Sequence, residues 1–430
     1  MRRHETPLPI SQALASHVPP SARRILDPAV GNGLLLQPFS DTVKSARYDI
    51  FAIDTDRTPL ESVQEKFGSS FRKLAIIRQD FLRWAYRFQI SKSPLFDCIV
   101  MNPPFCARKE QWVSFELIKK IGAFKDLPAS GPIEAAFVLM AIKLLKKGGR
   151  LLAILPASLI ATPTFDWLRH LVSASGAIHQ VHELPRFTFP GVGSRIYLVV
   201  FEKGTVGQRT LLLNHDLFKP EKLLVERKKP CDRLDFGYYQ SAIALKALKR
   251  RSEFDWRRLK DVAIIRRGSE PTPGVAKSVI HSTDLIDGFW FKVQLTKPTR
   301  VTKDSQIRCG DILAKRVSRD CARSFGLAFN IDGCLCSDCV LILRPKEKIN
   351  SLKILFAVRC LFSLDFAAVL IERGTGASYL NQGDLRLLEI PYGFWKIFHI
   401  HFAQYTRAVK ARHFLLMKQI ENSVKKLVSG

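Results

Sequence analysis

A short motif whose residue types can bind a planar amino group begins at Asn102, where the apolar segment 96–101 ends. The next two residues, Pro103 and Pro104, have no N–H donor and hold the backbone extended, which leaves their carbonyl oxygens able to accept hydrogen bonds. The Asn102 side-chain oxygen adds another acceptor, and Phe105 adds a flat aromatic surface. Together these groups can grip a planar amino group conjugated to a ring and accept both of its hydrogens. A turn that merely ends the strand is the alternative interpretation.

A glycine-rich turn precedes this motif at residues 27–33, with the sequence Asp-Pro-Ala-Val-Gly-Asn-Gly. Glycines there let the backbone turn tightly and approach a bound nucleoside. Asp27 closes the first predicted strand, and Asp54 closes the second, 21 positions after Gly33. A carboxylate in that place can accept hydrogen bonds from both ribose hydroxyls. Position 36 is Leu36 instead of the glycine of a dinucleotide site, which argues against a nicotinamide or flavin cofactor.

The elements that position these residues alternate between apolar strand-like segments and polar segments of helical spacing. Such alternation predicts an α/β fold with a doubly wound, Rossmann-like, mostly parallel sheet, whose ligands lie beyond the carboxyl ends of the strands. Each predicted strand ends in a polar residue or a tight turn. The predicted strands are 24–27, 50–54, 74–77, 98–101 and 151–155, and the predicted helices include 58–67 and 134–147.

The charge of the chain indicates a polyanionic partner. Its 430 residues include 67 Lys and Arg against 39 Asp and Glu, a formal net charge of +28. A charge of this size makes nucleic acid the first partner to consider, ahead of an anionic membrane surface. Because 47% of the residues are apolar, a disordered tail or a fibre is excluded.

The sequence pattern changes after about residue 204, and the charged, helix-breaking stretch 226–230 is the predicted linker. We therefore predict a catalytic domain over 1–225 and a second, α+β domain over 226–430. In the second domain we expect short strands near 263–266, 311–315 and 339–343, and a long C-terminal helix over about 395–427. The second domain has a net charge of +17, against +11 for the first 225 residues, so the basic excess is denser there.

With its motifs in this order, the segment from residue 1 to about 205 resembles the catalytic domain of the gamma-class N6-adenine DNA methyltransferases. In that class the cofactor motifs come first, the Asn-Pro-Pro-aromatic motif next and the DNA-reading domain last. The resemblance implies S-adenosylmethionine as the cofactor, with Asp54 on its ribose, Asp80 on its adenine amino group, and Thr6-Pro7 over its methionine part. The implied cofactor-binding residues are Thr6, Pro7, Asp27, Ala29, Gly31, Gly33, Asp54 and Asp80.

The same resemblance implies methyl transfer to adenine N6. The N6 lone pair is delocalised into the ring, and acceptance of both N6 hydrogens by the asparagine side chain and the next carbonyl returns electron density to the nitrogen. Because N6 is buried in a duplex, the base must be flipped out, and the resemblance implies that Phe105 and Phe189 stack on it. Phe187 competes with Phe189 for this role. The implied catalytic residues are Asn102, Pro103, Pro104 and Phe105.

The second half resembles a target recognition domain like those in the specificity subunits of Type I restriction systems. The resemblance rests on residues 374–381, 388–391 and 311–313, together with the predicted terminal helix. It implies double-stranded DNA as the partner and a place in a restriction–modification system. We find no nuclease motif, so cleavage would come from a separate restriction endonuclease.

The cysteines allow two interpretations. Cys334, Cys336 and Cys339 are spaced closely enough to suggest zinc, but structural zinc needs four ligands and no second tight pair follows. The alternation into 340–343 indicates that these thiols are partly core, and we predict no metal site. Nine cysteines scattered through a long chain fit reduced thiols in a cytoplasmic protein. The most apolar region, 135–159, is interrupted by Lys and Arg, so no membrane span is expected.

Two other functions use the same motifs. RNA methyltransferases and protein-glutamine methyltransferases also carry Asn-Pro-Pro-aromatic motifs, although they rarely need a basic C-terminal domain of this size. A DNA-binding protein on a methyltransferase scaffold that no longer turns over is the third possibility. Against it, every catalytic position named above holds a competent residue.

Overall fold

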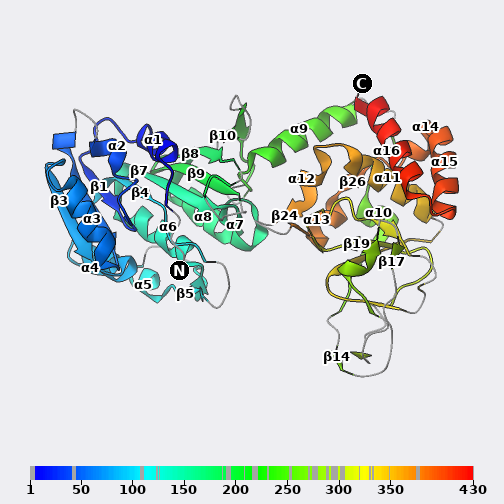
Figure 1. Cartoon of the computed structure of the whole chain (residues 1–430), viewed down its shortest axis with the longest axis horizontal. Helices are drawn as coiled ribbons and strands as arrows, with labels where there is room; N and C mark the ends of the chain where they lie inside the picture. Colours follow the sequence, from blue (N-terminus) through cyan, green and yellow to red (C-terminus); the bar gives the residue numbers. More distant parts are fainter. Residues whose placement is uncertain are drawn as a thin grey trace. The chain divides into compact units, whose positions relative to one another are not determined.

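The computed structural model describes two compact units, Met1–Phe236 and Gly237–Gly430 (Figure 1). The division falls 11 residues beyond the predicted boundary at 225. The last strand of the first unit continues to residue 226, and the segment that follows it still packs on that unit, because the Leu234 N–H donates to the Ile160 carbonyl. The described residues are 5–40, 45–106, 111–122, 124, 126–185, 187–189, 195–207, 209–215, 221–229, 232–250, 254–269, 272–273, 279–286, 290–291, 299–300, 306–318, 320–328, 331, 334–347, 349–373 and 378–429.

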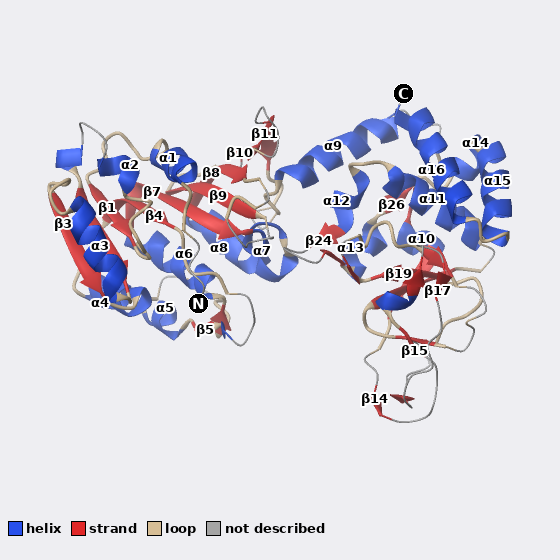
Figure 2. Cartoon of the chain, in the orientation of Figure 1, coloured by secondary structure: helices blue, strands red, loops and turns tan. Residues whose placement is uncertain are grey.

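The first unit is built on a nine-stranded sheet with the order β11-β10-β8-β9-β7-β4-β1-β2-β3 (Figure 2). Neighbouring strands from β7 to β3 pair in parallel, whereas β9 and β11 run antiparallel to their neighbours. The predicted doubly wound, mostly parallel sheet is therefore confirmed. Its strands are β1 Arg24–Asp27, β2 Asp49–Asp54, β3 Lys73–Arg78, β4 Phe96–Met101, β7 Leu145–Pro156, β8 Gly176–Glu183, β9 Ile196–Lys203, β10 Arg209–Asn214 and β11 Glu221–Glu226.

The helices of the first unit bury an apolar stripe against this sheet. In α3, the apolar residues Leu60, Val63 and Phe67 recur at helical spacing and join the cluster that contains Ile50 and Ala52 of β2. The residues of α6 are apolar on almost every side of the helix, and this composition explains why the helix is buried in the interior. The helices are α1 Leu8–Ala15, α2 Gln37–Ser40, α3 Arg57–Phe67, α4 Phe81–Ile90, α5 Glu116–Lys120, α6 Ile133–Leu144, α7 Ala157–Ala161 and α8 Asp166–Ser175, with a small ribbon of β5 Val113–Ser114 and β6 Ser130–Gly131.

The second unit is an α+β arrangement around a four-stranded antiparallel sheet with the order β13-β23-β19-β21. Its strands are β13 Ala263–Arg267, β19 Ile312–Lys315, β21 Gly326–Leu327 and β23 Val340–Pro345. The helices are α9 Phe236–Arg250, α10 Leu259–Val262, α11 Ser351–Ser363, α12 Ala367–Ile371, α13 Gln382–Leu387, α14 Phe394–Ile397, α15 His399–Lys410 and α16 Phe414–Ser429. Further short strands are β12 Arg257–Arg258, β14 Thr272–Pro273, β15 Val279–Ile280, β16 Leu285–Ile286, β17 Trp290–Phe291, β18 Thr299–Arg300, β20 Val317–Ser318, β22 Leu335–Cys336, β24 Glu372–Arg373, β25 Ser378–Leu380 and β26 Glu389–Ile390.

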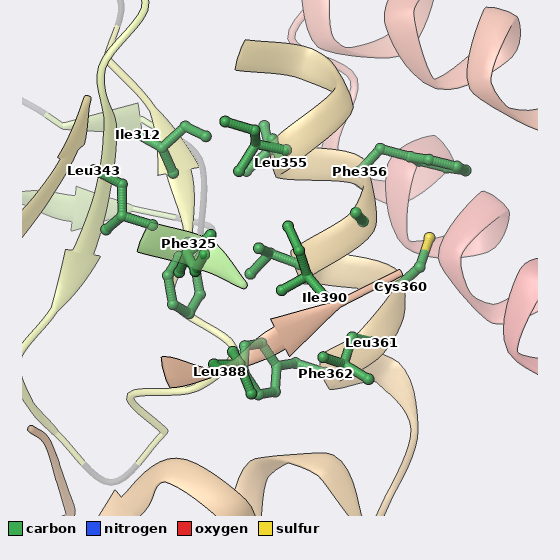
Figure 3. Close-up of a cluster of buried hydrophobic side chains, with 14 of the residues drawn as sticks. Ile312, Phe325, Leu343, Leu355, Phe356, Cys360, Leu361, Phe362, Leu388 and Ile390 are labelled. Carbon is green, nitrogen blue, oxygen red and sulfur yellow. The ribbon is translucent and has the colours of Figure 1, made fainter. Parts of the chain in front are cut away.

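Both faces of this sheet are covered. Side chains alternate along a strand, and accordingly Ile312 and Leu343 join the main cluster with Leu355 of α11 (Figure 3). Their neighbours Leu313 and Ile342 face a second, smaller cluster. The sheet therefore separates two apolar layers.

The long terminal helix predicted over 395–427 is wrong as a single element, because the segment forms α14, α15 and α16. The break between α15 and α16 is a left-handed turn at Arg412, with φ of 55°. The His413 N–H donates to the Ala408 carbonyl and the Arg412 N–H to the Val409 carbonyl, a pattern that satisfies the last carbonyls of α15. His413 Nδ1 then accepts from the Leu416 N–H at the start of the next helix.

The membrane expectation can be compared with the helices. Within the described part of the chain, no helix has both the length and the apolar composition that crossing a bilayer requires.

Candidate active site

A cavity of about 430 Å³ opens beyond the carboxyl ends of β1, β2 and β4, where such a sheet places its ligands. The structure brings most of the sequence-predicted site residues to its wall. Those that line it are Thr6, Ala29, Gly31, Asp54, Asp80, Asn102, Pro103, Pro104 and Phe105. The predicted residues that do not appear in its wall are Pro7, Asp27, Gly33 and Phe189.

The glycine-rich turn is held against β2 by backbone and carboxylate hydrogen bonds. Val30 N–H donates to the Ile53 carbonyl at 2.9 Å, and Gly31 N–H donates to Asp54 Oδ2 at 3.0 Å. Asp54 Oδ1 accepts the Asp56 N–H at 3.0 Å. One carboxylate thus joins the turn after β1 to the loop after β2, and it also faces the cavity. Gly31 has a φ of 50° and no heavy atom within 4 Å of the position a Cβ would take, so it leaves open space beside the turn.

Gly33 does not line the cavity and instead allows the glycine-rich turn to pack closely against α3. Its φ is 77°, and a Cβ there would lie 2.7 Å from Phe67 Cε2 and 3.0 Å from Val63 Cγ2. Because a left-handed conformation costs an L-residue about 1–2 kcal/mol, strain and overlap act together at this position. The glycine lets α3 approach the turn closely.

We expect Gly33→Ala to lower the free energy of unfolding by more than Gly148→Ala does. Gly148 has a φ of 76° and nothing within 4 Å of its would-be Cβ, so it reports the backbone strain without the overlap. The overlap with Phe67 adds about 1–3 kcal/mol by analogy with overpacked cores. Urea unfolding of both variants measures the difference. Equal destabilisation would show that α3 does not press on this turn.

Asp27 is fully buried beneath the turn. Its Oδ1 accepts the Ala29 N–H at 3.1 Å, while Oδ2 is buried with no hydrogen-bond partner among the described residues. Burial raises the pKa of Asp27 to about 7; the Ala29 hydrogen bond lowers it, and the charge of Asp54 raises it further. Asp27 does not line the cavity, and its hydrogen bond supports the turn from below.

The asparagine of the predicted catalytic motif is oriented by the N-terminal segment. Asn102 Nδ2 donates to Thr6 Oγ1 at 3.0 Å, across 96 residues of sequence, and Thr6 is only 5% exposed. Asn32 Nδ2 donates to Glu5 Oε1, which ties the same segment to the glycine-rich turn. The segment therefore lies over the cavity and contacts both motifs. Asp80 is used twice, since it lines the cavity and its Oδ1 caps α4 through the Arg83 N–H at 2.9 Å.

Several wall residues were not predicted from the sequence. Phe81 and Phe137 pack together at 4.7 Å between ring centroids and line the cavity with Ile133 and Asp56. Phe81 comes directly after Asp80, and Asp56 lies two residues after Asp54. Their closeness in sequence to these two acids could therefore have indicated that Phe81 and Asp56 line the cavity. The residues from α6 gave no such signal, because that helix is apolar nearly all round.

The predicted stacking residue Phe189 lies in the protein core. It is 1% exposed and packs in the cluster that includes Leu184 and Ile196. Phe187, which competed with it on sequence grounds, is 72% exposed and has a φ of 63°. A buried ring offers no face to a base, so exposure alone favours Phe187, and neither of the two rings lines the cavity.

The cysteines of the zinc hypothesis do not form a cluster of ligands. Cys336 is 1% exposed among Ile280, Leu313 and Ile342, and burial raises the pKa of its thiol well above the usual range. An apolar surrounding therefore favours the neutral thiol over the thiolate that binds metal. Among the described residues, no three His, Cys, Asp or Glu side chains gather closely enough to hold a metal ion.

Three histidines, His17, His182 and His215, pack together around β8, the strand that contains His182. The rings of His182 and His215 stack at 5.2 Å with His182 Nδ1 at 3.0 Å from His215 Nε2, and His17 contacts His182 edge-on at 5.3 Å. Burial, with smaller contributions from His17 and His215, lowers the pKa of His182 from 6.5 to about 3. Burial also lowers the pKa of His17 and of His215.

We expect this cluster to make the folded state less stable in mild acid. A histidine with a lowered folded-state pKa stabilises the fold above pH 6.5, and this contribution is lost as the pH falls from about 6.5 towards 3. Between pH 7 and pH 5 His182 alone accounts for about 2 kcal/mol. His182→Gln should flatten the fall of Tm over this range relative to the wild type, whereas the exposed His170→Gln should not. Parallel curves for the wild type and His182→Gln would contradict the assignment.

Comparison with known proteins agrees with this geometry. Residues 36–188 match the model of the Eco57I restriction-modification methylase family. A 109-residue stretch is 30% identical to the Type II methyltransferase M.PstI of Providencia stuartii; it covers 25% of this chain and 20% of that protein. The chain thus matches about a fifth of the length of M.PstI. It is similar to restriction–modification methyltransferases.

Two solved structures share the fold over nearly the whole chain. The Type IIL restriction-modification enzyme MmeI, solved in complex with DNA, aligns with a TM-score of 0.58 and 12% identity, covering 97% of this chain and 71% of that one. The type IIG restriction endonuclease BpuSI aligns with a TM-score of 0.50 and 15% identity, covering 99% and 65%. At these identities the likeness establishes the fold alone.

S-adenosylmethionine is the cofactor that the family match and the fold imply. The residues present fit it. The cavity offers carboxylate acceptors at Asp54 and Asp80 and open space beside Gly31. These groups match a ligand with ribose hydroxyls, an amino-substituted purine and a positive charge.

Proposed function

We propose that this chain is an S-adenosylmethionine-dependent DNA methyltransferase of a restriction–modification system, acting on the N6 amino group of a flipped-out adenine. The observation that carries the proposal is the placement of residues 102–105 at the end of β4, in the wall of the cavity that also contains Gly31, Asp54 and Asp80. An amino-group acceptor motif and a nucleoside-binding turn thus share one site. The order of these motifs supports the gamma-class arrangement.

The cofactor would be held by the glycine-rich turn, with its ribose on Asp54 and its adenine amino group on Asp80. When bound, it supplies an electrophilic methyl group on a sulfonium. Thr6 lies beside both this region and Asn102. No metal and no covalent intermediate with the protein is needed in this proposal.

The chain's own residues then act on the adenine amino group. Because Asn102 turns its amide nitrogen towards Thr6, its amide oxygen serves as one acceptor for an N6 hydrogen, and the Pro103 carbonyl serves as the other. Two preorganised acceptors stabilise the positive charge that develops on N6 during attack. The rest of the rate acceleration comes from alignment of the two reactants.

The target base must leave the duplex to reach this site. Phe105 lines the cavity and offers one stacking face. We assign the second face to Phe187, which is exposed, in place of the buried Phe189. Base flipping of this kind costs a few kcal/mol of unstacking, which a ring on either side of the base offsets.

We further propose that the second unit holds double-stranded DNA as a target recognition domain like that of Type I specificity subunits. Residues 237–430 carry 33 Lys and Arg against 17 Asp and Glu, a net charge of +16. Part of the motif region that suggested this resemblance, residues 374–377, lies outside the described residues. Of the rest, Asn381 caps α13 and Asp311 forms a buried ion pair with Arg344 at 2.7 Å, which are structural roles.

Methyl transfer from labelled S-adenosylmethionine tests the proposal. The purified chain is incubated with unmethylated bacterial genomic DNA, with total RNA, or with a protein extract, and the modified nucleosides are separated after digestion. We expect label in N6-methyladenine from DNA. Transfer only to RNA or to protein glutamine, or cofactor binding without any transfer, would reject the proposal in favour of the corresponding alternative.

A further inference from the structure

A buried acid on α6 contacts the backbone just after the catalytic motif. Glu134 is only 2% exposed, and its Oε2 accepts the N–H of Cys106 at 3.0 Å. Cys106 follows Phe105 directly in the chain. The hydrogen bond therefore fixes the position at which the chain leaves the cavity wall.

The surroundings of Glu134 make its charge costly for folding. It is the single acid in α6, a twelve-residue helix whose other buried residues are apolar. Among the described residues, the influences on its carboxylate are burial and two backbone N–H groups, with no charged neighbour. A buried carboxylate without a cation destabilises a fold unless hydrogen bonds compensate. Burial raises the pKa of Glu134 to about 7, and hydrogen bonds from its own N–H and from that of Cys106 lower it.

The same turn of α6 also reaches the cavity. Ile133 precedes Glu134 and Phe137 follows it one turn later, and both line the wall together with residues 102–105. Glu134 thus lies in the first turn of α6 and accepts the hydrogen bond of the peptide group that follows the motif. An apolar residue at this position would fill the core equally well but would remove the Glu134 acceptor from the Cys106 N–H.

We propose that Glu134 is a positioning residue that holds Phe105 and the Asn-Pro-Pro backbone in place through the Cys106 amide. This inference rests on the proposed methyl transfer, since the positioned groups are its acceptors and its stacking ring. Loss of the bond would let the motif shift against the cofactor region. Displacements of about 1 Å in a positioned group can cost about 100-fold in rate.

Two substitutions at this site separate positioning from packing. Glu134→Leu keeps the volume and removes the acceptor, whereas Glu134→Gln keeps an acceptor oxygen without the charge. We expect Glu134→Leu to lower kcat on genomic DNA by about 10- to 100-fold, with the Kd for S-adenosylmethionine and the Tm close to those of the wild type. Glu134→Gln should recover most of this rate. Glu61→Leu, at an exposed acid of α3 with a side chain 58% exposed, is the matched control.

Amide hydrogen exchange at Cys106, measured by NMR or mass spectrometry, reads the bond without any substrate. The Cys106 amide should lose protection in Glu134→Leu and keep it in Glu134→Gln. Unchanged protection, or a kcat of Glu134→Leu equal to that of the wild type, would overturn the proposal. So would loss of folding or of cofactor binding in both variants, which would make Glu134 a purely structural residue. If the wild type methylates no substrate, the proposed function fails, while the exchange result still decides whether Glu134 holds the turn.

Discussion

Replacing Asn102 with alanine is expected to lower kcat by about 10²–10³-fold or more, the usual loss when one preorganised partner of a developing charge is removed. The amide oxygen of Asn102 is one of two proposed acceptors for the N6 hydrogens, and the structure fixes its direction through the 3.0 Å bond from Nδ2 to Thr6. Removing the side chain removes that acceptor but leaves the Pro103 carbonyl. The affinity for S-adenosylmethionine should change little, since Asp54, Asp80 and the glycine-rich turn remain.

Single-turnover methylation of genomic DNA measures this effect, with equilibrium binding of cofactor and of DNA as parallel readings. Asn102→Asp is an informative second variant, because it keeps the acceptor and loses the donor to Thr6. It should retain more activity than Asn102→Ala. Full activity of Asn102→Ala, or loss of transfer that follows loss of cofactor binding, would mean that Asn102 is not the acceptor.

The parallel part of the sheet and the cavity could be predicted from the sequence because three of its strands end at residues with recognisable chemistry, whereas β8 to β11 were not predicted. Asp27, Asp54 and Asn102 mark the ends of β1, β2 and β4, and parallel strands bring their carboxyl ends to one edge. The local sequence therefore indicated both where each of these strands ends and that their ends lie close together at one edge of the sheet. The S-adenosylmethionine prediction came from the family resemblance that these residues carry.

The residues that sequence reasoning missed or misplaced depend on contacts between distant segments. The sequence favoured Phe189 through its Phe-Pro pair and left Phe187 as the competitor. The structure exposes Phe187, at a left-handed backbone position, and buries Phe189. Glu134 gave no signal because a single acid in an apolar helix has no motif around it. Its role is visible only once the Cys106 amide lies beside it.

The divided C-terminal helix has a related cause. Helices commonly end at glycine or before proline, and residues 395–427 contain neither. Here the left-handed position falls on Arg412, which carries a steric cost that glycine would not. Packing of α15 and α16 against α11 offsets that cost through buried residues such as Tyr405 and Met417. Tertiary contacts thus end a helix that local preference would continue.

A chain that ends at Phe236 is expected to bind S-adenosylmethionine as the full chain does and to lose most of its affinity for DNA. The described core clusters support separate folding, because the cluster on the catalytic sheet draws on residues 10–200 and the main cluster of the second unit on residues 245–428. The cavity residues all lie in the first unit. The truncation removes a net charge of +16 and leaves +12, so the phosphate contacts proposed for the second unit are lost.

Salt dependence separates this loss from a general weakening. Each phosphate contact contributes about 0.9 to the magnitude of the slope of log K against log salt, so the truncated chain should show a slope smaller by about 0.9 for each contact that the second unit makes. Its residual methylation should lose sequence selectivity, since the proposed target recognition domain is the removed unit. The matched control is the fragment of residues 237–430 alone, which should bind duplex DNA but not the cofactor. Loss of cofactor binding on truncation would place the boundary elsewhere, and retained selective methylation would assign target recognition to the first unit.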